Sequence, residues 1–497
     1  MKNILQADIC IIGGGIAGLY CAHKLAQRNP SRKITVFEGL SRLGGRVQTG
    51  SFCNGTFHPE FGALRIEPEL QPCVNELISE LKIPTTTANQ HNPTISMHPD
   101  FEKLHLEEQL LIKANPNQGA PLILLEHALK KILGKQWDIE GDHWDLPNRD
   151  EKKQFLRSTA IFNGILLYHQ GAWNVFSEVL SYEAIEFVRE KGAFYHLKNA
   201  NPNAADWISI LLDMRLIKQP SYSPVGGMDT LIHSLEKAIT EKQVNILCNH
   251  ELTCMKPNGD SSTQLIFSKK DDKTTVTVDA KTVILAIPQA ALLKLADSLP
   301  SHIIPLLSKV RPLPMVWAYC IVENPPWTKS TPTGNGKNMP VRAVHLELDG
   351  QNPPRFGMAM FYCDEPWSEY WADLVEEETS DLIGTHFEAQ INRGPRLTNA
   401  LSKALQSFLS LKDPPKIVEW AIRDWGRQPF GGGVHLWKPR AKSADVMNEL
   451  KAFSLNGSTV LKNIHICNEA FSDLQGFFEG SLRSANNALQ TIECEEG

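Results

Sequence analysis

The sequence lacks an excess of charge, a long apolar run and a secretion signal. Its 50 lysines and arginines are balanced by 56 aspartates and glutamates, so the net charge of −6 gives no electrostatic support for nucleic-acid binding. No window approaches the roughly 18 uncharged apolar residues of a membrane-spanning helix. The apolar run from Ile9 to Leu19 is broken by three glycines and has no small-residue cleavage site, which indicates a first strand and not a signal peptide.

Metal-ligand spacing is also missing. The ten cysteines follow no metal-binding pattern, and the 16 histidines show no pair of ligands on one helix. Several cysteines lie in apolar, strand-like runs, so we expect reduced, buried thiols, no metal and a cytoplasmic protein. No nucleophile elbow is present, which gives no support to a serine hydrolase.

The start of the chain has the pattern of a βαβ unit. A strand is expected over residues 8–12, a helix over 16–27 and a second strand over 33–38. Between strand and helix lies Gly13-Gly14-Gly15-Ile16-Ala17-Gly18, in which Gly13 permits a tight turn, Gly15 lets the backbone approach a pyrophosphate and Gly18 allows close packing. Glu38 ends the second strand, where a carboxylate can accept hydrogen bonds from both ribose hydroxyls.

The rest of the chain alternates between helical and strand-like regions. Helical periodicity dominates between about 120 and 215, and Asn203 is the expected cap of a helix over 204–214. Strands are expected over 244–247, 282–287, 314–322 and 355–363, with a helix over 378–392. A last strand begins at Ile464, and a final helix spans 479–492.

The segment after Glu38 and Gly39 identifies the cofactor class. Ser41-Arg42-Leu43-Gly44-Gly45-Arg46 resembles the signature of the flavin-containing amine oxidase superfamily, which implies FAD as the cofactor. Two glycines expose backbone N–H groups there, and Arg46 supplies a charge-assisted donor for phosphates. The alternative is a surface turn with a solvated arginine. No Cys or His lies in the closing segment 475–480, so we expect non-covalent binding.

Further matches to this superfamily follow in order along the chain. Residues 61–66 resemble the segment that passes the flavin ring, residues 226–229 a second segment of the FAD domain, and residues 468–480 the closing flavin motif, in which Glu469 would bind the ribityl–pyrophosphate stretch. The resemblance assigns cofactor contacts to Gly13, Gly15, Ile16, Ala17, Gly18, Glu38, Gly39, Gly45, Arg46, Gly62, Ala63, Leu64, Arg65, Leu252, Trp425, Glu469, Gly476, Phe477 and Phe478.

Arg65 and Tyr362 distinguish the classes within the superfamily. Both match positions that hold the substrate carboxylate in L-amino-acid oxidases, including the tryptophan oxidases of indole-pigment pathways. A guanidinium can bind a carboxylate with two parallel hydrogen bonds and stays charged, and a phenol donor completes the clamp. The alternatives are a salt bridge from Arg65 to Glu60 or Glu67, and a core position for Tyr362.

Trp317 departs from the family pattern. The superfamily usually has a lysine at this position, bridged by water to flavin N5. Its replacement casts doubt on fast reoxidation by oxygen and suggests an aromatic wall in the active site, unless Lys309 or another cation substitutes. Phe477 and Trp425 are the other aromatic residues that we expect around the substrate.

These motifs imply a Rossmann-type α/β fold of the glutathione-reductase kind. We expect an FAD-binding domain over 1–66, 222–300 and 455–497, a sheet-based substrate domain over 67–115 and 301–454, and a helical insertion over 116–221. The cofactor should lie at the topological switch point of the sheet.

The expected function is oxidation of an L-amino acid, with a hydrophobic or aromatic side chain as the first guess, to a 2-oxo acid, ammonia and hydrogen peroxide. Arg65, Tyr362 and Trp317 are the expected catalytic residues, and the expected partners are the amino acid and oxygen. Three alternatives stay open: a flavin amine or polyamine oxidase, a decarboxylating amino-acid 2-monooxygenase, and a non-catalytic FAD-binding module. Family members are often homodimers, although no sequence feature here indicates an interface.

Overall fold

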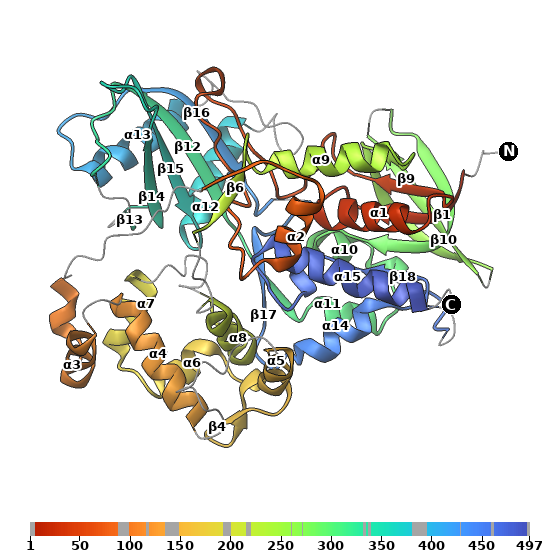
Figure 1. Ribbon diagram of the computed structural model, residues 1–497, viewed down its shortest axis with the longest axis horizontal. Helices are drawn as coiled ribbons and strands as arrows, with labels where there is room; N and C mark the ends of the chain where they lie inside the picture. The colour runs from red at the N-terminus through yellow and green to blue at the C-terminus, as the bar shows by residue number, and fades with distance from the viewer. Residues whose placement is uncertain are drawn as a thin grey trace.

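The computed structural model describes residues 5–87, 99–115, 119–134, 149–191, 200–214, 220–259, 261–270, 272–331, 334–335, 339–379, 395–427, 429–458 and 462–494. Three parts are visible in Figure 1: a sheet covered by helices that contains both termini, a second sheet with two helices, and a group of helices. This arrangement confirms the α/β fold with a helical insertion, while the exact domain limits stay predictions.

The larger sheet has seven strands and a mixed pairing pattern. Its order is β7-β2-β1-β10-β9-β8, with β18 paired to β10. The carboxyl ends of the parallel strands are in register, because Ile12 lies opposite both Phe37 and Leu285, and Leu285 lies opposite Ile466. Loops that follow these strands therefore meet at one edge, where α/β sheets bind ligands. The strands are β1 (Leu5–Ile12), β2 (Ile34–Phe37), β7 (Asn245–Leu247), β8 (His250–Asn258), β9 (Ser262–Lys269), β10 (Thr275–Leu285) and β18 (Ile464–Ile466).

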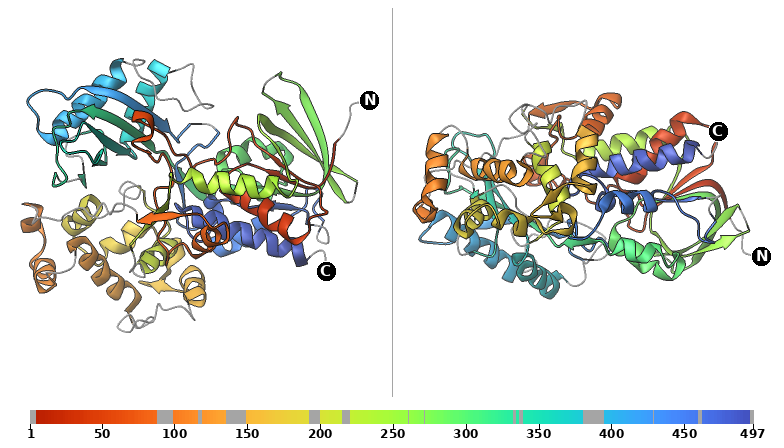
Figure 2. Two further views of the ribbon diagram at one scale, coloured as in Figure 1. Left: turned by 45° about the horizontal axis from the view of Figure 1, so that its top comes forward. Right: turned by 90° about the horizontal axis from the view of Figure 1, so that it is seen from below.

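Alternating side chains of β1 pack into two different layers. Ile9 and Ile11 contact the core under one group of helices, whereas Cys10 and Ile12 contact the core on the other face. Burial on both faces explains why this strand is a continuous apolar run and not an alternating one. The first layer holds α1 (Ile16–Arg28), α2 (Pro72–Glu80), α9 (Asp229–Thr240) and α15 (Phe478–Cys494), which lie side by side in Figure 2. The second holds α10 (Gln289–Lys294), α11 (Ile303–Leu307) and α14 (Ser443–Lys451).

The second sheet is antiparallel, with the order β13-β14-β15-β12-β16. One face packs Val316, Cys320 and Phe361 against α12 and α13, and the other face presents Trp317 and Tyr362 to the helical insertion. Its elements are β12 (Val316–Glu323), β13 (Gly334–Asn335), β14 (Ala343–Leu348), β15 (Phe356–Cys363), β16 (Ile417–Asp424), α12 (Trp367–Thr379) and α13 (Pro395–Leu409), and the ribbon of β11 (Val310–Leu313) with β17 (Val434–Trp437) lies between the two sheets.

The third part consists mainly of helices, and one of them, Leu106–Ala114, precedes the range 116–221 that was expected for the insertion. Asn203 caps its last helix as predicted, because its Oδ1 accepts a hydrogen bond from the Ala205 N–H at 3.0 Å. The elements are α3 (Leu106–Ala114), α4 (Ala120–Leu133), α5 (Arg149–Ser158), α6 (Ala172–Ser177), α7 (Tyr182–Lys191) and α8 (Ala204–Met214), with the ribbons β3 (Thr85–Thr87) with β6 (Tyr222–Pro224) and β4 (Ile161–Phe162) with β5 (Ile165–Leu166).

One expected helix lies largely outside the described residues, and one strand of the structure was not expected. The helix expected over 378–392 falls almost wholly outside the described residues, and the helix that the structure describes ahead of it, α12, ends at Thr379. Strand β14 was not expected, and it supplies side chains to the cavity described below. Among the described residues, none of the helices is both long and apolar enough to cross a membrane.

Candidate active site

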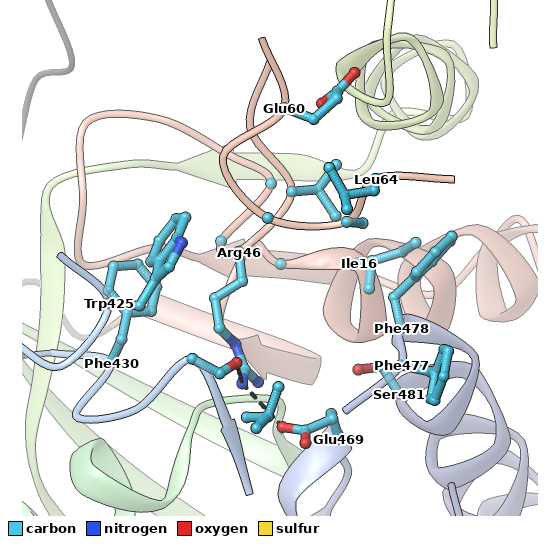
Figure 3. A pocket seen from close by; sticks show the side chains of 18 of the residues that line it. Ile16, Arg46, Glu60, Leu64, Trp425, Phe430, Glu469, Phe477, Phe478 and Ser481 are labelled. Carbon is cyan, nitrogen blue, oxygen red and sulfur yellow. Dashed lines mark hydrogen bonds and ion pairs between the residues drawn. The ribbon is translucent and has the colours of Figure 1, made fainter. Parts of the chain in front are cut away.

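A cavity of about 1070 Å³ joins the two sheets. Its lining residues come from the loops at the carboxyl edge of the larger sheet, from the inner face of the smaller sheet and from α8 of the insertion. Figure 3 shows part of this cavity, with the helix that begins at Ile16 and the helix that begins at Phe478 on one side and Trp425 and Phe430 on the other. The site is therefore assembled from stretches that lie far apart in the sequence.

The glycines before α1 form an open cradle. Gly13 has a φ of 109°, and a side chain there would collide with the Ala286 carbonyl oxygen. At Gly15, by contrast, an added Cβ would meet only the Cα of Gly45, at 4.0 Å. The first N–H groups of any α-helix have no intrahelical partner. Gly15 is the N-cap of α1 and has no side chain that could accept hydrogen bonds from them. Gly15, Ile16 and Ala17 line the cavity, and this geometry suits a phosphate.

Glu38 lies beside the cradle at the end of β2. Its Oε2 accepts a hydrogen bond from the Gly14 N–H at 2.7 Å, and its Oε1 accepts one from the Leu40 N–H at 2.8 Å. Desolvation raises the pKa of this carboxyl, although these two donors partly oppose the shift. Each carboxylate oxygen can accept a further bond, so ribose hydroxyls can still be bound. Gly39 and Leu252 line the same end of the cavity.

Arg46 and Glu469 form the most strongly connected pair of the site. The Arg46 Nη1 donates to the Glu469 carboxylate at 2.9 Å and to the Gly433 carbonyl at 2.9 Å, and Figure 3 marks the first of these contacts. Glu469 also accepts from the backbone N–H and the Nδ1 of His435, both at 3.0 Å, and from the Gly476 N–H at 2.8 Å. Burial opposes ionisation of Glu469, but Arg46 and His435 hold its pKa well below its ordinary value. Glu469 therefore anchors Arg46, which the sequence did not predict.

Two segments enclose the cavity around the expected ring position. A side chain at Gly62 would collide with the Arg46 carbonyl, so the stretch Gly62–Leu64 packs directly on the turn that carries Arg46. Trp425 is 1% exposed, and its indole N–H donates to the Phe61 carbonyl. The residues assigned to this region that line the cavity are Gly45, Gly62, Ala63, Leu64, Trp425, Gly476, Phe477 and Phe478.

The residues expected to bind the substrate lie in the same cavity. Trp317 and Tyr362 are neighbours on paired strands, with ring centroids 4.9 Å apart in an edge-to-face arrangement. Arg65 also lines the cavity, with 44% of its side chain exposed, and its Nε donates to Glu67 at 2.6 Å. The salt bridge considered as an alternative is thus present. It uses only Nε, and neither Nη atom makes a hydrogen bond or an ion pair within the described part of the chain. Lys309 is not one of the lining residues.

Several residues that line the cavity were not predicted from the sequence. His345 and Glu347 on β14 line the cavity together with Met358 and Met360 on β15. Phe430 also lines it, and the centroid of its ring lies 5.0 Å from that of the Trp425 ring. The signal was present in Ala343–Leu348, where the polar residues alternate with apolar ones as on a strand with one face toward a cavity.

Comparison with known proteins identifies the family. The sequence model of the family described as "flavin containing amine oxidoreductase" matches residues 16–492. The chain belongs to this family. The uncharacterized protein R188 of Acanthamoeba polyphaga mimivirus is 21% identical over 98% of this chain and 94% of its own length. An L-amino acid oxidase of Bothrops pictus is 24% identical over 47% of this chain and 44% of its own length. The solved structure of wild-type putrescine oxidase bound to putrescine shares the fold, with a TM-score of 0.64 and 16% identity over 99% of this chain and 100% of that one.

The cavity of this flavin-containing amine oxidoreductase fits FAD. The open space over Gly15, the uncapped start of α1 and the cationic Arg46 suit a pyrophosphate, and the carboxylate of Glu38 suits a ribose. The resemblance, the fold class and the FAD cofactor expected from the sequence are confirmed. The role of each individual residue and the non-covalent mode of binding remain predictions.

Proposed function

We propose that the protein is an L-amino-acid oxidase. The substrate Cα–H and amine together lose two electrons and two protons, and water hydrolyses the resulting imino acid to a 2-oxo acid and ammonia. Oxygen takes up the two electrons and two protons and becomes hydrogen peroxide. FAD supplies the hydride acceptor for this chemistry when it is bound. The protein contributes binding, orientation and a dry environment.

The observation that carries this proposal is the presence of Arg65 and Tyr362 in one cavity with the FAD cradle. An amine oxidase needs only an apolar tunnel, whereas an amino-acid oxidase needs a fixed cation for the carboxylate. The two Nη atoms of Arg65 can bind both carboxylate oxygens. The Tyr362 hydroxyl donates to the Met315 Sδ at 3.6 Å, and it can donate to the substrate carboxylate in place of this weak acceptor. The partial match to an L-amino acid oxidase supports the same assignment.

Aromatic residues contribute the dry environment. Trp317 is 5% exposed and Trp425 1%, and both line the cavity with Phe430 and Phe477. Exclusion of water disfavours the charged ammonium and therefore favours the neutral amine, which is the form that can lose hydride. These side chains also provide an apolar surface for a hydrophobic substrate side chain.

An amine or polyamine oxidase is the second candidate. Two observations favour it: Glu67 already neutralises Arg65 at 2.6 Å, and the fold of a putrescine oxidase matches the whole chain. Under this alternative Arg65 is a structural residue. A decarboxylating monooxygenase and a non-catalytic flavoprotein are the other two alternatives. Each would give a different result in the flavin-reduction experiment described next.

Anaerobic reduction of the bound flavin tests the proposal. The purified protein is mixed separately with an L-amino acid, its D enantiomer and the amine that lacks the carboxylate, using the phenylalanine and the lysine series. Loss of the visible flavin band with the L-amino acids alone supports the proposal, whereas loss with the amines alone supports an amine oxidase. In air and with catalase present, which stops hydrogen peroxide from decarboxylating a 2-oxo acid, release of carbon dioxide together with an amide indicates a monooxygenase. No flavin reduction by any amino acid or amine indicates a non-catalytic protein.

Substitution of Arg65 tests the carboxylate clamp. We expect Arg65→Ala to lower kcat/KM for L-amino acids by about 10-fold to 100-fold, because a charge-assisted hydrogen bond contributes about 1.5–3 kcal/mol. Arg355→Ala is the control, since Arg355 is 64% exposed and is not a lining residue. An unchanged KM for L-amino acids in the Arg65 variant would contradict the clamp. A cytoplasmic location and a homodimer also remain predictions.

A further inference from the structure

One wall of the cavity carries a carboxylate that the proposed chemistry does not use. Strand β14 places Ala343, His345 and Glu347 on one face, opposite Tyr362, Met360 and Met358 of β15. With the exception of Ala343, all of these residues line the cavity. Along this wall the side chains therefore change from the polar phenol of Tyr362, through the apolar Met360, to the carboxylate of Glu347.

The Glu347 carboxylate has no partner in the described part of the chain. Its backbone carbonyl accepts a hydrogen bond from the Trp327 indole N–H at 3.3 Å, but this bond does not involve the carboxylate. Desolvation raises the pKa of the carboxyl, and no cationic side chain among the described residues opposes the shift. The carboxyl is partly buried. Desolvation and Glu60 raise the pKa of the Tyr319 phenol, and Glu347 lies close enough to add a smaller contribution to that shift. A partly buried carboxylate without a hydrogen bond is costly, which argues against a purely structural role.

The spacing along the sheet defines what can reach Glu347. Tyr362 and Met358 lie four residues apart on one strand, which corresponds to about 13 Å between their Cα atoms. Met360 lies between them, so a substrate that extends from Tyr362 toward Glu347 passes over methionine side chains. Methionine is apolar and adaptable, and it therefore suits an unbranched aliphatic chain.

We propose that Glu347 binds a cationic group at the far end of the substrate. The substrate is then an amino acid with a long aliphatic side chain that ends in a cation, such as L-lysine, L-ornithine or L-arginine. This inference rests on the proposed function. It replaces the hydrophobic or aromatic side chain expected from the sequence by one with an apolar stem and a charged end. Glu347 acts as a specificity-determining residue, since its carboxylate touches the substrate but not the reacting atoms.

The test compares a cationic substrate with a neutral one of similar length. Anaerobic flavin reduction is measured with L-lysine and with L-norleucine, in the wild type and in Glu347→Gln, which keeps the shape and removes the charge. We expect the wild type to prefer L-lysine, and the variant to lose about 10-fold to 100-fold in kcat/KM for L-lysine but less than about threefold for L-norleucine. Glu323→Gln is the control, because Glu323 belongs to the same sheet but does not line the cavity.

The outcomes separate this inference from the proposed function. Equal use of L-lysine and L-norleucine by the wild type, or equal loss of both in Glu347→Gln, would overturn the role of Glu347 even if L-amino acids reduce the flavin. Reduction by cadaverine but by no L-amino acid, with a loss in Glu347→Gln, would support Glu347 and refute the proposed amino-acid oxidase.

A binding measurement covers the case in which Glu347→Gln folds poorly. Here 6-aminohexanoate and hexanoate compete with substrate in the wild type; both carry the carboxylate, neither carries an α-amine, and only the first carries the distal cation. Inhibition at least about tenfold tighter by 6-aminohexanoate is expected, and equal inhibition would contradict the proposal.

Discussion

Replacement of Glu469 by glutamine should weaken both the fold and the cofactor site. The carboxylate is 4% exposed and accepts hydrogen bonds from Arg46, from two nitrogens of His435 and from the Gly476 N–H. Glutamine has the same shape, but it presents an NH2 donor to groups that are themselves donors. Removing one partner of a buried ion pair costs about 3–5 kcal/mol. Because the pKa of Glu469 lies below its ordinary value, its stabilising effect is fully present at neutral pH and is lost only as the pH falls through that lowered value.

The cofactor effect can be separated from the stability effect by a matched variant. Glu479 is fully buried, and it accepts hydrogen bonds from Arg483 at 2.9 Å and from the N–H groups of Cys73 and Val74, but it does not line the cavity. We expect Glu469→Gln and Glu479→Gln both to lower the Tm of the apoprotein. Only the first should raise the Kd for FAD, by about tenfold or more, because Arg46 loses its anchor. Titration of both apoproteins with FAD at a temperature where they are folded measures this difference. An unchanged Kd in Glu469→Gln would refute the anchoring role.

Two further predictions follow from Gly15 and Glu60. Gly15→Ala should leave the Tm of the apoprotein nearly unchanged, since an added Cβ meets only the Gly45 Cα at 4.0 Å. It should raise the Kd for FAD by about tenfold or more, and a wild-type Kd would show that the space over Gly15 is not the phosphate site. Burial raises the pKa of Glu60 from its ordinary value of 4.5 to about 8 in the folded protein. The folded state thus holds a proton that the unfolded state loses, so stability falls as the pH rises between these values, and Glu60→Gln should show a smaller loss of Tm between about pH 5.5 and pH 8.5. An equal loss of Tm in both proteins would disprove this assignment.

The beginning of the fold could be predicted because local signals agree there. The apolar run of β1, the glycines before α1 and the position of Glu38 each point to the same βαβ unit, and the structure places them together. The closing helix was predicted to begin at Glu479 and begins at Phe478, a difference of one residue. The order of the motifs along the chain was enough to predict that Gly15, Arg46 and the closing segment 475–480 lie near one another, and residues of all three line the cavity.

Contacts between distant segments could not be predicted in the same way. Arg46 was expected to face phosphates, but its ion pair with Glu469 joins residues 423 positions apart, and no local pattern encodes such a pairing. The Arg65–Glu67 salt bridge was foreseen as an alternative, since two long charged side chains only two residues apart can reach each other in an extended segment. Glu347 was missed because β14 is short and was not recognised as a strand, so the alternation that directs His345 and Glu347 into the cavity was not considered.

The helical insertion helps to position the segment that leads from Asp473 to Phe477, although the insertion itself contributes few residues to the lining of the cavity. Lys153 of α5 is 3% exposed and lies 2.6 Å from Asp213 of α8 and 3.5 Å from Asp473, which also pairs with Arg483 of α15 at 2.9 Å. Burial opposes ionisation of Asp473, but Arg483 and Lys153 hold its pKa below its ordinary value, so Asp473 stays charged at neutral pH. A partly buried carboxylate that has two cationic partners on different elements helps to fix those elements relative to each other, because separating either pair leaves a charge that is only partly compensated. Asp473 lies four residues before Phe477, and the insertion therefore helps to set where this aromatic side chain enters the cavity.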